Sequence, residues 1–342
     1  MITDLNGATL AFDRTDNHLV ILDQTLLPKE VKLLHLSVPD EIFEAISVLR
    51  VRGAPAIGVA AAIAMAVCAK NIKMQDKQEY FTRLESIKEY LASSRPTAQN
   101  LFWALERMMA TARQVEYLSI SQINERLADE AELVLNEDIA VCRRIGGHGA
   151  MLLGDGACVL THCNAGRLAA VKYGTALAPV YVAAEQGKKI HVYVDETRPL
   201  LQGARLTAYE LADAGIKTTV ICDNMAGSLM AAGKVDAVIT GADRIAKNFD
   251  AANKIGTLQL AVMAKHFGVP FYIAAPKSTF DPDCASGNDI VIEMRSGSEI
   301  AGVWRESAAV PPDFDYNPAF DVTPAALISA IITEEGVHYL HE

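Results

Sequence analysis

The sequence predicts an α/β protein with a mainly helical N-terminal domain, residues 1–145, followed by a domain built on a parallel sheet, residues 146–342. Two patterns predict this division. Before residue 145, long stretches carry apolar residues three and four positions apart, which is the spacing of amphipathic helices. After residue 146, short β-rich runs alternate with helical stretches, and this alternation favours right-handed crossovers and a parallel sheet covered on both faces.

The N-terminal domain opens with two short runs, 8–12 and 18–22, that could form strands. Predicted helices then occupy residues 39–50, 55–70, 77–93, 96–112 and 121–145. The most apolar stretch, Ala54–Ala69, is rich in alanine and shorter than the ~20 residues that cross a bilayer, so we expect a buried helix. The first residues lack a basic patch followed by an apolar run. These features predict a cytoplasmic protein without a membrane partner.

The C-terminal domain has predicted strands at 157–162, 189–194, 217–222, 237–240, 270–274 and 289–292. Predicted helices cover 165–178, 206–214, 225–232, 253–267 and 323–333, and Ser296–Pro318 reads as an irregular loop. Ligands of open parallel sheets bind beyond the carboxyl ends of the strands. The residues that follow each strand, rich in acids, Arg and one thiol, are therefore the candidates for an active site.

Composition limits the classes of partner. The chain has 342 residues with 31 Lys and Arg against 42 Asp and Glu, a net charge of −11. Without a basic block it is poorly suited to bind nucleic acid, because phosphate neutralisation needs clustered cations. A phosphate site must be built locally, from aimed cations and helix ends. The scattered cysteines indicate reduced core residues of an intracellular protein; they are Cys68, Cys142, Cys158, Cys163, Cys222 and Cys284.

Two segments place an arginine directly before a predicted helix with proline in its first turn, Arg52 before Gly53-Ala54-Pro55 and Arg95 before Pro96. Free amides at such a helix start carry partial positive charge, and an arginine fork grips phosphate oxygens in pairs. Gly53 allows the backbone to approach an anion closely. These features favour a phosphate site, although ordinary helix starts with solvated arginines also fit.

Cys163 follows a predicted strand and precedes Asn164-Ala165-Gly166 and a predicted helix, a position that favours a reactive thiolate. A buried core cysteine is the alternative. His162 should point to the opposite face of its strand, so Cys158, His162 and Cys163 do not suit a zinc site, and we expect no metal.

Asp243 follows another strand and could act as a general acid or base; capping a helix or pairing with Arg244 are the alternatives. Lys254, close to the start of the next predicted helix, suits an anion. The glycine fingerprint of dinucleotide-binding domains and the phosphate loop of NTPases are both missing. We therefore expect no nucleotide cofactor.

Several strings together resemble the methylthioribose-1-phosphate isomerase family, over about residues 15 to 337. They occur in family order at Val51–Gly58, Ser94–Ala98, Thr161–Gly166, Glu196–Pro199, Gln202–Ala208, Gly241–Asn248, Ala252–Gly256 and Asn317–Pro324. The resemblance implies a helical N-terminal domain, a Rossmann-like C-terminal domain without a nucleotide, and a homodimer. It also implies an aldose–ketose isomerisation of a sugar phosphate in methionine salvage, without metal or cofactor. Regulatory subunits of a translation-initiation exchange factor, which are not enzymes, share this fold.

By motif, the resemblance implies that Asp243 is the proton donor and Cys163 the other catalytic residue. It implies substrate-binding roles for Arg52, Gly53, Ala54, Arg95, Gln202, Asn253 and Lys254, with the catalytic pair across a cleft between the domains. Hydrogen transfer from C2 to C1 by an enediol or by a hydride shift stays open.

The chain departs from the family pattern at Phe249, where glycine is usual, at Arg167, where a small residue is usual, and at Met294, which replaces glutamate. An aromatic ring and an extra cation near the site could reshape the pocket around the 5-substituent of the sugar. 5-Deoxyribose 1-phosphate is therefore an alternative substrate, and surface variation without consequence is the other interpretation. A non-catalytic subunit that senses sugar phosphates is a more remote alternative.

Overall fold

A computed structural model of the chain describes residues 2–96, 98–302 and 316–341. Their contacts divide the chain into two units, Met1–Ala140 with Arg167–Gly174, and Val141–Gly166 with Thr175–Glu342. The sequence analysis placed residues 167–174 in the second domain, whereas the structure packs this segment into the first unit. Thr9 shows how it is held there, because its backbone amide donates to the carbonyl oxygen of Val171 at 3.0 Å.

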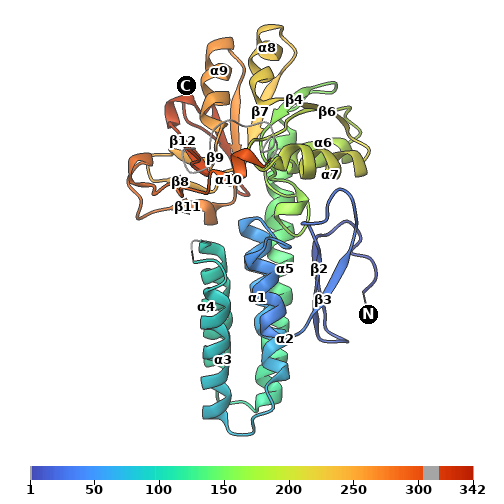
Figure 1. Cartoon of the computed structure of the whole chain (residues 1–342), viewed down its shortest axis with the longest axis vertical. Coiled ribbons are helices and arrows are strands. Elements are labelled where there is room, and N and C mark those ends of the chain that lie inside the picture. The colour runs from blue at the N-terminus through green and yellow to red at the C-terminus, as the bar shows by residue number, and fades with distance from the viewer. Residues whose placement is uncertain (1, 97, 303–315, 342) are drawn as a thin grey trace. The chain divides into compact units, whose positions relative to one another are not determined.

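The first unit combines a small antiparallel sheet with long helices (Figure 1). The strands lie in the order β1 (Leu10–Asp13), β2 (His18–Leu22) and β3 (Leu33–Leu36). The helices are α1 (Pro39–Ser47), α2 (Ala54–Asn71), α3 (Lys77–Ala92), α4 (Gln99–Gln114) and α5 (Ile120–Ala150), the last of which continues into the second unit. The sequence analysis missed β3 and placed the start of α4 at Pro96, three residues too early.

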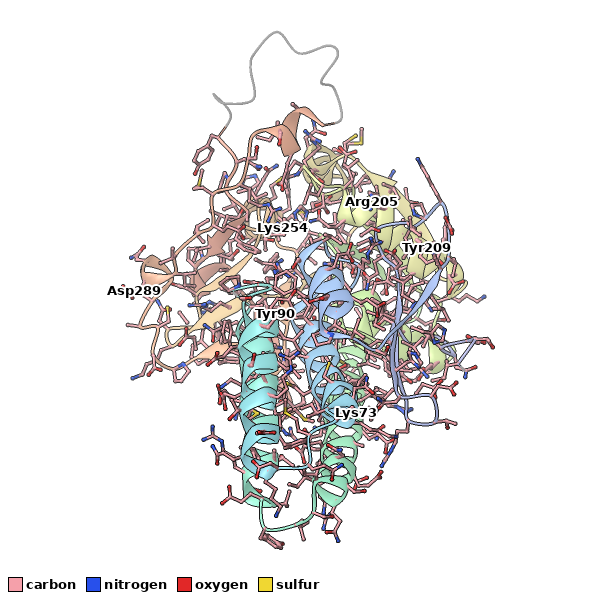
Figure 2. All side chains as sticks on the ribbon, turned by 60° about the horizontal axis from the view of Figure 1, so that its bottom comes forward. Lys73, Tyr90, Arg205, Tyr209, Lys254 and Asp289 are labelled. Carbon is pink, nitrogen blue, oxygen red and sulfur yellow. The ribbon has the colours of Figure 1, made fainter. Side chains whose placement is uncertain are left out.

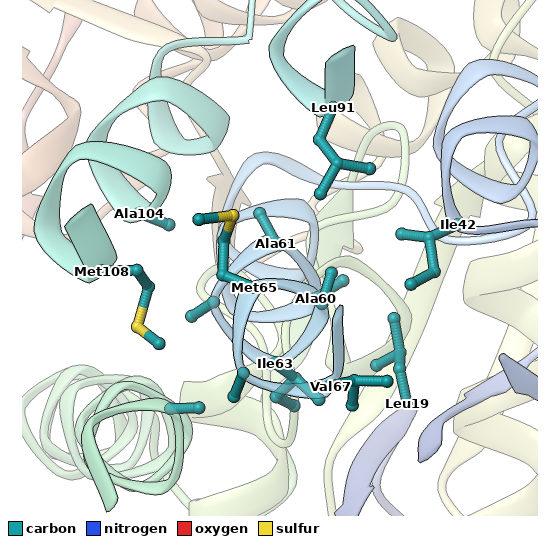
Figure 3. Packing of buried hydrophobic residues seen from close by; sticks show 14 of the residues in the cluster. Leu19, Ile42, Ala60, Ala61, Ile63, Met65, Val67, Leu91, Ala104 and Met108 are labelled. Atoms are coloured by element: carbon teal, nitrogen blue, oxygen red, sulfur yellow. The ribbon is translucent and has the colours of Figure 1, made fainter. Parts of the chain in front are cut away.

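Helix α2 forms the core of the first unit. Every residue from Ala56 to Ala69 is buried, and Figure 3 shows Ile63 and Met65 among side chains from α1, α3, α4 and β2. Of the helices in the described residues, α2 alone is long and apolar enough to cross a membrane, but 78% of its apolar window is buried inside the protein. The prediction of a buried core helix is therefore confirmed.

Within the described part of the second unit, seven strands form one sheet in the order β14-β13-β10-β7-β4-β5-β6. Neighbouring strands are parallel except β14, which runs antiparallel to β13. Their bounds are β4 (Cys158–Thr161), β5 (His191–Asp195), β6 (Lys217–Ile221), β7 (Ala237–Thr240), β10 (Phe271–Ala274), β13 (Ala330–Ile332) and β14 (Val337–Tyr339). The predicted Rossmann-like, parallel-rich fold class is confirmed.

A smaller sheet, which the sequence analysis did not predict, lies beyond the carboxyl end of β7. Its strands lie in the order β11 (Phe280–Asp281), β8 (Arg244–Ala246), β9 (Ala251–Lys254) and β12 (Phe320–Thr323). The helices of this unit are α6 (Ala178–Glu185), α7 (Ala208–Asp213), α8 (Ala226–Ala231), α9 (Thr257–Phe267) and α10 (Ser298–Ala301). Strand β9 occupies the first residues of the helix expected at 253–267.

Three further predictions for residues 146–342 are wrong. Residues 289–292 form no strand, and the helix expected at 165–178 is only a short 3-10 turn, Arg167–Ala169, ahead of α6. The helix expected at 323–333 is instead a 3-10 turn followed by β13. Short buried strands and buried helical segments have the same apolar pattern, so only pairing with β10 decides the structure of β13. Residues 303–315 of the predicted Ser296–Pro318 loop lie outside the described residues.

Candidate active site

The order of the strands defines where a ligand of this sheet should bind. From β4 the chain continues to β5 and β6 on one side, and then places β7 on the other side of β4. Ligands bind at such a switch point, outside the carboxyl ends of the two strands where the direction reverses. Cys163 follows β4 and Asp243 follows β7. The two predicted catalytic residues therefore lie at the same edge of the sheet, at its switch point.

The loops that carry these two residues are in contact. A Cβ atom built on Gly241, in the loop after β7, would lie 2.8 Å from the Cβ of Ala165, in the loop after β4. The backbone amide of Asp243 donates to the carbonyl oxygen of Ala252 at 2.8 Å, which joins the loop to β9. The Asp243 side chain is exposed and Cys163 is half-buried, so both can be reached by a ligand from solvent.

Cys163 occupies a strained backbone position. Its φ is +62°, a left-handed conformation that is uncommon for any residue with a side chain and that clusters at functional sites. Two threonines fix it from either side. Its amide donates to Oγ1 of Thr197 at 2.8 Å, and its carbonyl oxygen accepts from Oγ1 of Thr207 at 2.6 Å. These bonds hold the thiol at the turn directly after β4.

Lys254 brings a cation to the pair. It ends β9 (labelled in Figure 2), and its Nζ donates to the carbonyl oxygen of Ala319 at 2.8 Å and lies 4.7 Å from the Phe320 ring centre. Burial lowers the pKa of its ammonium group, while the charges of Cys163 and Asp243 act in the opposite direction. Because these charges act on Lys254, the three side chains share one electrostatic environment.

Gln202 and Asn253 belong to the same unit, Gln202 at the start of the irregular helix Gly203–Thr207 and Asn253 on β9. Oε1 of Gln202 is buried and has no hydrogen-bond partner among the described residues. Gln202 precedes Gly203, where a Cβ would lie 1.8 Å from the carbonyl oxygen of Asp195, so its loop is packed directly against the end of β5. Nδ2 of Asn253 donates to Oγ1 of Thr257 at 3.0 Å. The unpartnered oxygen of Gln202 is free to accept a hydrogen bond from a ligand.

The remaining predicted residues belong to the first unit. Arg52, Gly53 and Ala54 lie at the start of α2, which has proline in its first turn and no acidic residue or side-chain cap. Arg95 lies in the segment before α4. A Cβ on Gly58 of α2 would lie 3.0 Å from the carbonyl oxygen of Asn100 in α4, so both helix starts lie at the same end of this unit. The predicted binding residues thus form two groups, one in each unit.

Some residues around Cys163 were not identified from the sequence. Thr197 could have been found, because it follows β5 directly and strand ends at a switch point carry ligand contacts. Thr207 lies in an irregular helix and has no comparable local signal. His162, expected on the opposite face of the strand from Cys163, is 1% exposed.

A group of possible metal-binding side chains, His162, Asp195 and Asp223, lies within 4.8 Å. Both ring nitrogens of His162 already have protein partners, and the two oxygens of Asp223 accept from the backbone amides of Thr197 and Arg198 at 2.7 and 2.8 Å. This set of donors does not fit a metal site.

The three departures from the family pattern are Phe249, Met294 and Arg167. Phe249 is 42% exposed with φ +68°, and lies at the turn between β8 and β9. Asp243 and Lys254 lie at the end of this hairpin that is opposite the turn. A strand of about three residues, or about 10 Å, separates that end from the turn. Its register therefore argues against the expectation that Phe249 reshapes the pocket. Met294 is 58% exposed, and Arg167 packs within the first unit.

The fold and the site define a class of protein. Its members carry a thiol and a carboxyl group at the switch point of a Rossmann-like sheet, and their sequence lacks the glycine fingerprint of dinucleotide-binding domains. Comparison with known proteins then identifies the family. The chain belongs to the initiation factor 2 subunit family, whose sequence model matches residues 50–339.

The chain is 52% identical to methylthioribose-1-phosphate isomerase of Symbiobacterium thermophilum, over 96% of this chain and 92% of that protein. It is 53% identical to 5-deoxyribose 1-phosphate isomerase of Petrotoga mobilis, over 94% and 92%. The crystal structure of 5-methylthioribose 1-phosphate isomerase from Pyrococcus horikoshii OT3 is 43% identical with a TM-score of 0.92, covering 97% of this chain and 92% of that one.

Proposed function

We propose that this protein isomerises a 5-substituted ribose 1-phosphate to the corresponding ribulose 1-phosphate, with 5-methylthioribose 1-phosphate as the substrate, in methionine salvage. The observation that carries the proposal is the convergence of Cys163 and Asp243 at the switch point, with the charge of Lys254 beside them. Relatives that are about half identical over most of the chain carry the names of such isomerases.

The chemistry explains why an acid and a thiol are both needed. A phosphate on the anomeric oxygen blocks the spontaneous ring opening of free aldoses, so the protein must open the ring itself. In our proposal Asp243 donates a proton to the ring oxygen as its bond to C1 breaks. Hydrogen then moves from C2 to C1, through an enediol or as a hydride, with Cys163 assisting at that carbon. C2 is oxidised and C1 is reduced within one molecule, so the electrons balance without an outside partner. The proton that the C2 hydroxyl releases as the ketone forms returns to the carboxylate of Asp243 and restores the acid, so the protons balance as well.

The binding groups are assigned by charge and geometry. We assign the phosphate to Arg52, Arg95 and the free amides at Gly53 and Ala54, because a helix start without acidic residues favours an anion. We assign the sugar to Gln202, Asn253 and Lys254. In this proposal the protein uses no cofactor, binds neither nucleic acid nor a membrane, and acts as a homodimer in the cytoplasm. Light scattering of the purified protein tests the dimer.

The decisive experiment follows the sugar by carbon NMR. Purified protein is incubated with 5-methylthioribose 1-phosphate in the presence of a chelator and without added cofactor, and a ketose carbonyl signal is expected. No turnover of any 5-substituted ribose 1-phosphate would favour a non-catalytic, sugar-phosphate-sensing subunit. The alternative substrate, 5-deoxyribose 1-phosphate, is tested in parallel, and the ratio of the two kcat/KM values decides between them.

Substitution tests the two assigned roles. Asp243→Asn should lower kcat by about 10²–10⁴-fold, the typical contribution of a general acid, with KM changed little. Cys163→Ser should lower kcat in the same range. Asp283→Asn and Cys222→Ser change exposed residues and serve as matched controls with unchanged kcat. A wild-type kcat in Asp243→Asn would remove the proton-donor role.

A further inference from the structure

His162, the residue before Cys163, is buried and makes polar contacts that the proposed chemistry does not use. Its Nδ1 lies 3.0 Å from Oδ2 of Asp195, at the end of β5. Its Nε2 lies 2.8 Å from the carbonyl oxygen of Ile255, the residue after Lys254. His162 and Asp195 are each 1% exposed. One imidazole therefore joins the ends of β4, β5 and β9, the elements that carry the predicted catalytic and sugar-binding residues.

The hydrogen-bond partners fix where the protons lie. A carbonyl oxygen only accepts, so Nε2 of His162 must carry a hydrogen. Nδ1 and Oδ2 lie at hydrogen-bond distance, and two bare acceptors would repel, so one proton lies between them. The pair is then either imidazolium with carboxylate or imidazole with carboxylic acid. In both cases it is neutral overall and holds one proton more than a neutral histidine beside an ionised aspartate.

The surroundings favour keeping that proton. Burial raises the pKa of Asp195 to about 6. The pKa of His162 is also raised, because Asp195 and Asp223 outweigh the cost of its burial. Three acidic groups act on the pair: Asp223 after β6, Glu196 after β5 and Asp321 on β12. Oδ1 of Asp195 is buried without a hydrogen-bond partner among the described residues, which further disfavours an ionised carboxylate.

The backbone around the pair is shaped to hold it. Gly256 has φ +104°, and a Cβ there would lie 2.9 Å from Cε1 of His162, so glycine is needed for the ring to fit. Oγ1 of Thr197, which accepts from the Cys163 amide, donates in turn to the carbonyl oxygen of Asp195 at 2.9 Å. Asp195 thus supports Cys163 twice, through His162 and through Thr197.

We propose that His162 is a positioning residue for the isomerisation, which with Asp195 forms a buried, proton-holding pair that fixes the strained turn at Cys163 relative to the end of β9, which carries Lys254. The expected changes in kcat and KM rest on the proposed function, because they require the isomerisation as the reaction that is measured. Loss of the shared proton at high pH leaves one ring hydrogen for two acceptors, Oδ2 of Asp195 and the carbonyl oxygen of Ile255. One of the two contacts of the ring is then lost, which releases the turn. The expected consequence is an alkaline decline in kcat.

Two substitutions of His162 each keep one of the two hydrogen bonds of its ring and remove the other. His162→Asn keeps a donor toward Asp195 and loses Ile255, whereas His162→Gln keeps a donor toward Ile255 and loses Asp195. Each should lower kcat by about 10- to 100-fold, the cost of a small misplacement of a reacting group, while KM stays within threefold. His191→Asn, at the opposite end of β5, is the matched control and should leave both constants unchanged.

Asp195→Asn tests the proton itself. Its amide can donate to Nδ1 and has no proton to lose, so kcat at pH 6.5 should stay within threefold of wild type and the alkaline decline should disappear. A merely structural role for Asp195 predicts an unchanged pH profile. An unchanged decline, or a collapse of kcat in a variant with wild-type thermal unfolding, would overturn the proposal.

A readout independent of turnover separates this inference from the proposed function. Alkylation of Cys163 by iodoacetamide is followed by peptide mass spectrometry, with the exposed Cys222 as internal reference. In both His162 variants the Cys163 rate should rise at least threefold relative to Cys222. Equal rates together with wild-type kcat in folded variants refute the positioning role. If the His162 variants do not fold, the pH profile of Asp195→Asn decides. Wild-type protein without turnover refutes the proposed function, while the alkylation result still tests the placement.

Discussion

Replacing Gly53 by alanine should destabilise the N-terminal unit, because two separate effects act at this position. Gly53 has φ +88° and ψ 135°, and a Cβ there would lie 2.2 Å from the carbonyl oxygen of Ala169. A side chain in a left-handed conformation costs about 1–2 kcal/mol, and overpacking against backbone adds about 1–3 kcal/mol, so we expect a loss of about 2–5 kcal/mol in the free energy of unfolding.

Gly7→Ala is the matched control in the same unit. Gly7 has φ +79°, but a Cβ there would meet only Nη1 of Arg167 at 3.9 Å, which is an ordinary contact. Its substitution should therefore cost only the backbone contribution, about 1–2 kcal/mol. The difference between the two variants isolates the close approach of Gly53 to Ala169.

Cys68 reports the opening of this unit. It lies on α2, is 2% exposed, and burial raises the pKa of its thiol to about 12, so labelling requires the unit to open. Because 1.36 kcal/mol corresponds to a factor of ten, the expected loss makes labelling of Cys68 in Gly53→Ala about 30- to 5000-fold faster than in the wild type. Peptide mass spectrometry measures the rate. Labelling in Gly53→Ala no faster than in Gly7→Ala would refute the steric argument.

Three further substitutions test the sugar side of the site. Because the pKa of Lys254 is lowered, its ammonium group loses its charge at a lower pH than a free lysine, so KM of the wild type should rise at alkaline pH. Lys254→Arg should remove this rise, because arginine stays charged. A KM profile from pH 7 to 10 that is the same in both proteins contradicts this. Gln202→Leu should raise KM about 3- to 10-fold, the value of one hydrogen bond, without lowering the melting temperature, and an unchanged KM would remove Gln202 from the site. Phe249→Gly should alter stability by less than about 1 kcal/mol, because relief of its left-handed backbone offsets the loss of its edge-on contact with Phe280. The ratio of kcat/KM for the methylthio and deoxy substrates should not change, and a tenfold change would place Phe249 at the pocket.

The local sequence pattern predicted those helices and strands whose residue types repeat with a clear helical or strand spacing. Helix α2 follows from a long run of alanine and branched residues, and β4, β5, β6, β7 and β10 follow from short runs rich in β-forming residues. Since parallel strands end at the same edge of a sheet, the positions of Cys163 and Asp243 directly after two such runs could also be inferred. Both side chains are at that edge in the structure.

Long-range contacts decided the rest. Ala330–Ile332 pairs with β10 as a strand although its residues also fit a helix, and Arg167–Gly174 packs with the first unit although it follows Cys163 closely in the chain. The order of the strands, and therefore the position of the switch point, depends on which strands pair with one another. No single segment of the sequence determines this pairing.

The sequence by itself determined which chemical groups the protein carries at its strand ends and helix starts, because these follow from residue type and local period. Only the tertiary structure decided that the side chains of His162 and Asp195 meet behind Cys163. The two partners of His162, Ile255 and Asp195, lie 93 and 33 positions away from it in the chain, and no local pattern encodes a contact at such separations.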